Sequence, residues 1–238
     1  MEAKKTALVT GANKGIGLEI VRQLAAAGLT VILGARNLEA GKAAALGMTN
    51  VSPMWIDLGN PETIQAAAAI IGEKYGYLDV LVNNAAIVDP ADGPPSVVSA
   101  DAVRRTMETN FYGTLAVTQA MLPLLKKAPS ARIVSLSSGL ASLRLNGDPN
   151  WSFAGVKYLG YNMSKTALNM MTVQLAYELR DTPIKVNAVS PGFIATDMNA
   201  NKGTGTVQEG AAEPVRLALL GPDGPSGGYF EAGERLPW

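Results

Sequence analysis

The stretch Thr10-Gly11-Ala12-Asn13-Lys14-Gly15-Ile16-Gly17 decides the fold of this chain. It lies between an apolar run at residues 6–10 and a helical pattern at residues 16–27, so three glycines fall where a strand turns into a helix. Gly11 allows the tight turn, Gly15 lets backbone N–H groups approach a pyrophosphate, and Gly17 lets the helix pack closely on the sheet. The spacing G-x-x-x-G-x-G at this position favours dinucleotide binding over a purely structural turn.

Short runs rich in Val, Ile and Leu alternate with helical patterns along the rest of the chain. Such continuous apolar runs indicate strands covered on both faces, and the stretches between them are long enough for crossover helices. The expected strands are residues 6–10, 30–33, 51–56, 79–82, 132–136 and 184–189, and the expected helices are residues 16–27, 38–46, 61–74, 100–127 and 156–179. This alternation predicts an α/β protein with a Rossmann-type, doubly wound parallel sheet of about seven strands.

Two segments lack helical or strand character. Residues 88–99 are rich in Asp, Gly and Pro, and residues 197–210 are rich in Asn, Gly and Thr. Both are expected to be loops, and loops beyond the carboxyl ends of parallel strands line the ligand crevice. Gly28 is expected to end the first helix, and Pro61 to lie in the first turn of another. Without a repeat or linker, residues 1–238 are expected to form one NAD(P)-binding domain.

The composition excludes several classes of function. The 20 Lys and Arg balance the 20 Asp and Glu, which argues against nucleic acid or an anionic membrane as a partner and favours a small-molecule ligand. The chain has no Cys and no His, which removes thiol nucleophiles, the commonest general base and the usual zinc ligands, and no metal is expected. Because no signal-peptide pattern or membrane-length apolar stretch is seen, a soluble cytoplasmic protein is expected.

Tyr161 and Lys165 stand four residues apart on an expected helix, where positions i and i+4 share a face. An ammonium about 5.5 Å from a phenol, at an effective dielectric of about 20, favours the phenolate by about 3 kcal/mol, or about two pK units. The pair is therefore expected to bring the pKa of Tyr161 towards neutral, where the phenol can give or take a proton. Taken alone, the spacing could equally be a solvated contact on a helix surface.

Polar residues follow the second, third and fourth expected strands. The second strand is followed by Arg36, where a free ribose 2′-hydroxyl would favour an acidic residue, and Arg36 with Lys14 can bind a 2′-phosphate. NADP(H) is therefore expected over NAD(H), although Arg36 could be a solvated loop charge. Asp57-Leu58 suits an adenine contact, and Asn83-Asn84-Ala85-Ala86 lies where the cofactor would cross the sheet, although paired asparagines also cap turns.

Together these features resemble the short-chain dehydrogenase/reductase family. The resemblance rests on the glycine-rich turn, Asn83-Asn84-Ala85-Ala86, Ser138, the pair of Tyr161 and Lys165, and Pro191-Gly192, which occur in the family's order over essentially the whole chain. Several runs are similar to the carbonyl-reductase branch: Asn13-Lys14-Gly15-Ile16-Gly17, Asn110-Phe111-Tyr112-Gly113-Thr114, Thr196-Asp197-Met198 and Pro214-Val215-Arg216-Leu217-Ala218-Leu219-Leu220.

The resemblance implies an oxidoreductase that transfers a hydride from NADPH to a ketone or aldehyde, reversibly and without a metal. Tyr161 would be the general acid that protonates the carbonyl oxygen, and Ser138 would donate a hydrogen bond to the same oxygen. Lys165 would lower the pKa of Tyr161 and hold the nicotinamide ribose. Asn110 would hold a water that relays protons to Lys165, although it could also be a core or surface residue.

The resemblance also implies a cofactor-binding set, in which the residues after Pro191-Gly192 would meet the nicotinamide carboxamide. Its members are Gly11, Asn13, Lys14, Gly15, Ile16, Gly17, Arg36, Asp57, Leu58, Asn84, Tyr161, Lys165, Ile194 and Thr196.

Two departures from the family's pattern bear on the site. The 23 residues from Ser138 to Tyr161 exceed the usual gap but lack the large insertion of the mammalian monomeric carbonyl reductases, so a monomer is not implied. Residues 144–158 are expected to form an extra loop at the site mouth, with Trp151 and Phe153 either touching substrate or packing on the domain. Tyr158 lies seven residues before Lys165, and this spacing resembles that of the enoyl-reductase branch of the family. That branch, however, has Met where this chain has Tyr161 and lacks this glycine turn.

Alternative functions remain. One is a non-catalytic, NADP-binding regulatory module, against which the intact catalytic set argues. Another is an enoyl reductase of the same fold, and a third is an epimerase or dehydratase, which usually needs a larger C-terminal region. A homodimer or homotetramer is expected because the helices at 100–127 and 156–179 carry more apolar residues than one buried stripe needs, including Met121, Leu122, Met170 and Met171.

Overall fold

The computed structural model describes residues 4–238, and residues 1–3, where the sequence showed no signal-peptide pattern, lie outside the described part. Eight strands form one sheet in the order β3-β2-β1-β4-β5-β6-β7-β8, parallel throughout except for the last pair. The strands are β1 (Thr6–Val9), β2 (Thr30–Ala35), β3 (Val51–Trp55), β4 (Val80–Asn83), β5 (Arg132–Leu136), β6 (Lys185–Val189), β7 (Gly228–Glu231) and β8 (Glu234–Arg235). The order reverses between β1 and β4, which is the switch point that opens a ligand crevice in such sheets.

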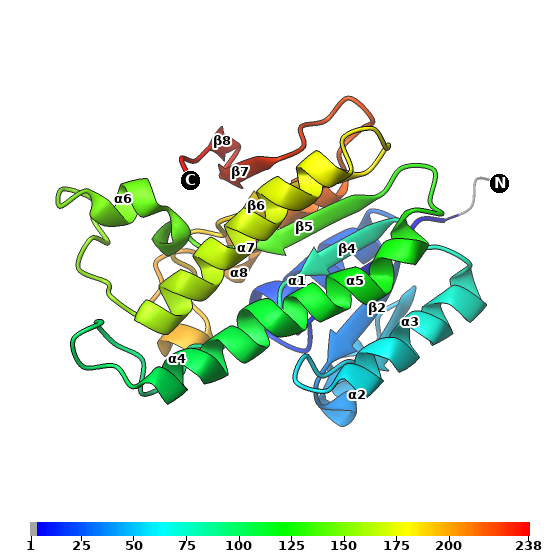
Figure 1. Ribbon diagram of the computed structural model, residues 1–238. Coiled ribbons are helices and arrows are strands. Elements are labelled where there is room, and N and C mark those ends of the chain that lie inside the picture. Colours follow the sequence, from blue (N-terminus) through cyan, green and yellow to red (C-terminus); the bar gives the residue numbers. More distant parts are fainter. Residues whose placement is uncertain (1–3) are drawn as a thin grey trace.

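Helices cover both faces of the sheet. Figure 1 shows α4, α5 and α7 in front of it and α1 and α8 behind it. The helices are α1 (Gly15–Ala26), α2 (Leu38–Ala45), α3 (Pro61–Tyr75), α4 (Ala100–Met107), α5 (Thr114–Leu125), α6 (Leu143–Gly147), α7 (Leu159–Glu178) and α8 (Val207–Ala218). One apolar core lies under α3, α5 and α7 and a second under α1 and α8, so the predicted doubly wound α/β fold is confirmed.

The predicted boundaries need correction in several places. The expected helix at 100–127 is interrupted by a π-helical turn, Glu108–Gly113, and the helix expected at 156–179 begins at Leu159. The expected loop at 197–210 contains a 3-10 turn, Asp197–Asn199, and its last residues belong to α8. The expected loop at 144–158 includes most of α6. Strands β7 and β8 were missed because their sequences, Gly-Tyr-Phe-Glu and Glu-Arg, do not form a run of Val, Ile and Leu like the strands that were predicted.

The predicted roles of Gly28 at the end of one helix and of Pro61 at the start of another are confirmed. Gly28 has φ +90 just after the end of α1, a conformation that glycine adopts without strain. Pro61 is the first residue of α3, and the Asn60 side chain caps that helix by accepting from Glu62 N–H at 3.0 Å. The end of α1 and the start of α3 therefore fall within one residue of the expected positions.

Candidate active site

The glycine-rich turn is built against the end of β4. Gly11 has φ +61, and a Cβ on it would lie 2.8 Å from Cα of Ala85, so no larger residue fits without movement. The Asn84 side chain donates to the carbonyls of Thr10 at 2.8 Å and Gly11 at 3.1 Å. Asn84 therefore holds the turn from behind. The paired asparagines are structural at this point, as the turn-residue interpretation allowed, although Asn84 also lines the cavity described next.

Helix α1 presents its N-terminus to a cavity of about 480 Å³. Lys14 is the extended residue that precedes α1, and among the described residues no side chain caps this end of the helix. The first backbone N–H groups of α1 are therefore free to bind an anion, and Gly15, with φ +57, brings the chain close to it. The cavity is lined by Gly11, Asn13, Lys14, Gly15, Ile16, Gly17, Arg36, Asp57, Leu58, Asn84, Tyr161, Lys165 and Thr196, among others. These residues fit a dinucleotide with its pyrophosphate at α1.

Of the predicted cofactor-binding residues, all of which are described in the structure, only Ile194 does not line the cavity. It is buried against Gly205 and Gly210, where a Cβ on either glycine would lie 2.7 Å from it. Its backbone carbonyl accepts from the Asn199 side chain at 2.8 Å. Ile194 thus supports the segment that brings Ala195 and Thr196 to the cavity.

Two cations stand at the far end of the cavity, where β1 and β2 end. Arg36 follows β2, and Lys14 precedes α1. Lys14 Nζ lies 2.8 Å from a carboxylate oxygen of Asp197, and both side chains are 67% exposed. A surface pair of this kind contributes less than about 1 kcal/mol, so Lys14 can exchange Asp197 for a phosphate.

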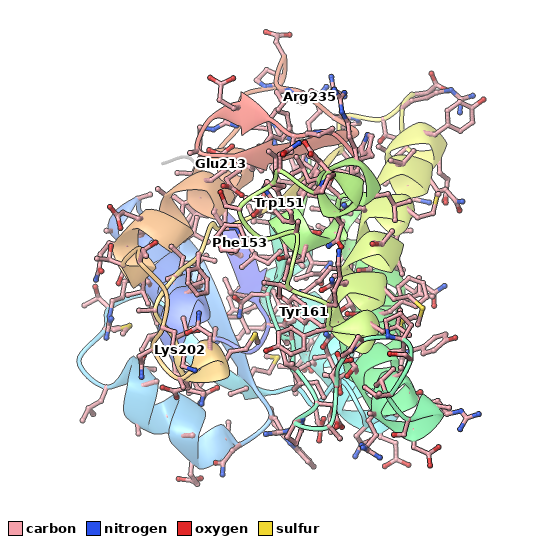
Figure 2. All side chains as sticks on the ribbon, turned by 90° about the vertical axis from the view of Figure 1, so that its left-hand side faces the viewer. Trp151, Phe153, Tyr161, Lys202, Glu213 and Arg235 are labelled. Atoms are coloured by element: carbon pink, nitrogen blue, oxygen red, sulfur yellow. The ribbon has the colours of Figure 1, made fainter. Side chains whose placement is uncertain are left out.

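Tyr161, Lys165 and Ser138 meet where β5 ends beside α7. Lys165 is 2% exposed, and its Nζ donates to the Leu136 carbonyl at 2.7 Å while lying 5.8 Å from the centre of the Tyr161 ring. Ser138 follows β5, and its side chain is hydrogen-bonded to that of Tyr161. Figure 2 shows Tyr161 at the start of α7. The structure therefore brings the three predicted catalytic groups together.

The expected lowering of the pKa of Tyr161 is wrong for this structure. Burial raises the pKa of the Tyr161 phenol, and the hydrogen bond with Ser138 opposes that rise. Burial also lowers the pKa of Lys165 to about 7. The argument from sequence assumed a fully charged lysine beside a solvated phenol. In the structure both groups are desolvated, and the Lys165 ammonium points to the Leu136 carbonyl.

Asn110 lies in the π-helical turn and is completely buried. Its side chain accepts from Ile87 N–H at 2.8 Å and donates to the Ile87 carbonyl at 2.9 Å and to Ser164 Oγ at 3.0 Å. Both N–H groups and one lone pair are therefore used, and Asn110 ties the segment after β4 to α7. The surface interpretation of Asn110 is wrong, and its role in a proton relay stays a prediction.

The start of α7 is held by a residue that the sequence did not indicate. Asp92, in the loop after β4, accepts from the backbone N–H groups of Gly160 at 3.0 Å and Tyr161 at 2.8 Å. Leu159 N–H also donates to the Gly93 carbonyl at 3.0 Å. The carboxylate thus caps the helix that carries Tyr161. Asp92 lies 69 residues from Tyr161 in sequence, so no local pattern signals the contact.

Tyr229 of β7 is a second contact that the sequence did not indicate. Its hydroxyl donates to the Ser138 backbone carbonyl, and its ring stacks on Trp238 with centroids 5.4 Å apart. Burial raises the pKa of Tyr229 well above its ordinary value, so the phenol stays protonated and keeps donating. Tyr229 therefore fixes the backbone of Ser138 from behind.

Tyr158 does not lie on α7. It is the extended residue before the helix and is 44% exposed, whereas Tyr161 is partly buried and lines the cavity. The two-turn spacing to Lys165 that made Tyr158 a competitor therefore does not exist in the structure.

A doubly wound sheet, an uncapped helix N-terminus at a glycine-rich turn and a cavity-lining tyrosine beside a buried lysine define a dinucleotide-dependent oxidoreductase. No helix within residues 4–238 is long and apolar enough to cross a membrane.

Comparison with known proteins agrees with this class. Residues 5–206 match the family described as short chain dehydrogenase. The chain is 34% identical to carbonyl reductase (NADPH) 1 of Mus musculus, over 99% of each chain. Two solved structures are similar. One is NADPH-bound carbonyl reductase from chicken fatty liver, with a TM-score of 0.87, 29% identity, and 99% of this chain and 94% of that one covered. The other is salutaridine reductase from Papaver somniferum, with a TM-score of 0.83, 28% identity, and 96% and 100% covered.

The chain therefore belongs to the short-chain dehydrogenase/reductase family, and within it the chain is similar to the carbonyl reductases.

Proposed function

We propose that this protein is an NADPH-preferring reductase of ketones or aldehydes that also oxidises the corresponding alcohols. The observation that carries the proposal is the meeting of Tyr161, Ser138 and Lys165 at the edge of the dinucleotide cavity. The chain offers an acid, a hydrogen-bond donor and a cation at one point without using His or Cys. The alternative of a binding module without chemistry has no use for this arrangement.

When bound, the nicotinamide cofactor supplies the hydride. Tyr161 is the general acid: with its pKa raised, the phenol is protonated at neutral pH and can give its proton to the carbonyl oxygen. Ser138 Oγ donates a hydrogen bond to the same oxygen as negative charge develops on it. Lys165 lies near enough to stabilise the tyrosinate that remains and to hold the nicotinamide ribose.

Cofactor preference rests on Arg36 and Lys14, which offer two cations to a 2′-phosphate at the end of β2. Asp57 and Leu58 also line the cavity and would contact the adenine. The similar proteins named for NADPH support the same preference.

A carbonyl panel tested with NADPH and NADH in parallel examines both parts of the proposal. We expect reduced-cofactor consumption that depends on a ketone or aldehyde and is more efficient with NADPH. Including enones in the panel separates reduction of the carbonyl from reduction of the double bond. Binding of NADPH without turnover of any carbonyl would instead support a regulatory module.

The variant Arg36→Ala tests the cofactor assignment. We expect the KM for NADPH to rise about tenfold or more, corresponding to loss of one charge-assisted contact, while the KM for NADH stays nearly constant. Lys202→Ala is the matched control, because Lys202 is an exposed cation on the segment after Thr196 that does not line the cavity (Figure 2). An equal change for both cofactors would remove the role given to Arg36.

A further inference from the structure

Three aromatic rings form a continuous row beside the catalytic groups. Trp151 and Phe153 come from the segment between α6 and α7, and Phe193 from the segment after β6. The ring centres of Trp151 and Phe153 are 5.5 Å apart and those of Phe153 and Phe193 are 5.6 Å apart, both edge to face. This geometry is the favoured one for aromatic pairs. The row joins two segments that are about 40 residues apart in sequence.

Both ends of the row are fixed close to the reacting groups. A Cβ on Gly139 would lie 3.2 Å from Trp151 Cζ2, so the indole packs on the residue next to Ser138. Phe193 is two residues from Pro191, which lines the cavity together with Tyr161. In Figure 2, Trp151 and Phe153 lie above Tyr161 in the view, with Phe153 further to the left.

The rings keep much of their surface free. Phe153 is 37% exposed and Phe193 is 40% exposed, even though each packs against a neighbouring ring. A row that served only to close the fold would bury these faces, whereas a wall that receives a ligand leaves them open. Leu136, whose carbonyl accepts from Lys165 Nζ, also lines the cavity beside the catalytic groups.

Resting on the proposed function, we infer that Trp151, Phe153 and Phe193 form an aromatic wall of the substrate site. The wall selects uncharged carbonyl compounds in which a flat aromatic ring is bonded directly to the carbonyl carbon. An aryl ketone can place its ring against the row while its oxygen reaches Ser138 and Tyr161. A saturated ring of the same size fills the space without the edge-to-face contact.

Two matched probes test this inference: acetophenone and cyclohexyl methyl ketone, which share size and carbonyl position. The variants are Phe153→Leu and Phe193→Leu, which keep apolar volume and remove the ring. We expect each to lower kcat/KM for acetophenone about two- to tenfold, mostly through KM, and to change that for cyclohexyl methyl ketone less than twofold. Leu143→Ala is the control, because Leu143 is exposed and apolar on α6 but outside the row. Leu143→Ala should leave kcat/KM unchanged for both ketones.

Equal losses for the two ketones, or no loss for either, would overturn the aromatic wall. So would failure of the wild type to reduce acetophenone while it reduces other carbonyls of the panel, and in that case the proposed function stands. If the wild type reduces none of the carbonyls of the panel with NADPH, the proposed function fails and the inference fails with it. Because the readout compares two substrates in one variant, a general loss of folding cannot imitate the expected result.

Discussion

At the scale of single residues, the central feature is a partly buried acid beside a buried cation. Lys165 has a pKa of about 7, so near neutral pH it is about half protonated, and its Nζ is held by the Leu136 carbonyl. Tyr161 has a raised pKa and is protonated. This state suits reduction, in which the tyrosine must start with its proton.

Burial of Lys165 makes stability depend on pH. Its pKa is about 7 in the folded chain and about 10.4 in an unfolded one, so between these values the unfolded state binds more protons. The free energy of unfolding of the wild type minus that of Lys165→Met should therefore rise between about pH 7 and pH 9, by up to about 1 kcal/mol per pH unit. Urea unfolding of both proteins at several pH values measures this difference in the free energy of unfolding. A difference that is flat or falls with pH would contradict the lowered pKa.

The sequence predicts which residues gather at the site but not their charge states. Spacing places Tyr161 and Lys165 on one helix face, and the resemblance adds Ser138. The pKa of Tyr161 depends on how deeply the pair is buried and on where Nζ points, and neither is visible in the sequence. Tyr229 is equally hidden, because its contact with Ser138 spans 91 residues.

At the scale of elements, α7 positions the catalytic tyrosine, and its first turn is fixed from outside. The Asp92 carboxylate accepts from two N–H groups of that turn. Gly160 makes this contact possible, since a Cβ there would lie 3.1 Å from Asp92 Oδ2 and 3.2 Å from Cα of Val103 in α4. The loop that carries Asp92, helix α4 and helix α7 are therefore closely packed beside Tyr161.

We expect Asp92→Ala to lower stability by about 1 to 2 kcal/mol, the usual effect of losing a helix cap, and to lower kcat several-fold. Affinity for NADPH should stay near that of the wild type, because the glycine turn and α1 do not depend on this loop. Asp92→Asn, which keeps one acceptor oxygen, should recover part of kcat. Chemical unfolding, steady-state kinetics and cofactor titration provide the three readouts.

Asp101→Ala is the matched control for Asp92. Asp101 is an exposed carboxylate of α4 that pairs with Arg104. Its loss should leave kcat unchanged. If Asp92→Ala kept the kcat of the wild type, the cap would have no bearing on Tyr161.

The elements that the sequence predicts well are those with long patterns. The expected strand at 132–136 coincides with β5, and the helices at 38–46 and 61–74 match α2 and α3 within one residue. The π-helical turn at Asn110 was not predicted, because one extra residue in a turn barely changes a helical period.

At the scale of the whole molecule, α7 carries apolar residues beyond those that the core uses. Met121 is fully buried and Leu122 packs on the core, so these two do not support association, contrary to the sequence argument. Four exposed residues on α7 recur at intervals of seven, three and four positions and so share one face: Met163, Met170, Val173 and Tyr177.

The expected homodimer or homotetramer stays a prediction, and this face of α7 is where we expect contact. Light scattering coupled to size-exclusion chromatography should give a mass of at least twice 24.8 kDa. Met170→Lys combined with Tyr177→Lys should shift the protein towards monomer, since charge on the face opposes burial. Val97→Lys, on an exposed loop residue, is the control. A wild-type monomer at all concentrations would rule the assembly out.

The most direct test of the account compares Tyr161→Phe with Tyr158→Phe, using a carbonyl that the wild type reduces with NADPH. The first variant removes the phenol at the cavity, and the second removes one that lies outside α7. We predict that Tyr161→Phe lowers kcat by about a hundredfold or more while binding NADPH as the wild type does, and that Tyr158→Phe keeps its turnover. Wild-type turnover by Tyr161→Phe would show that Tyr161 is not the acid.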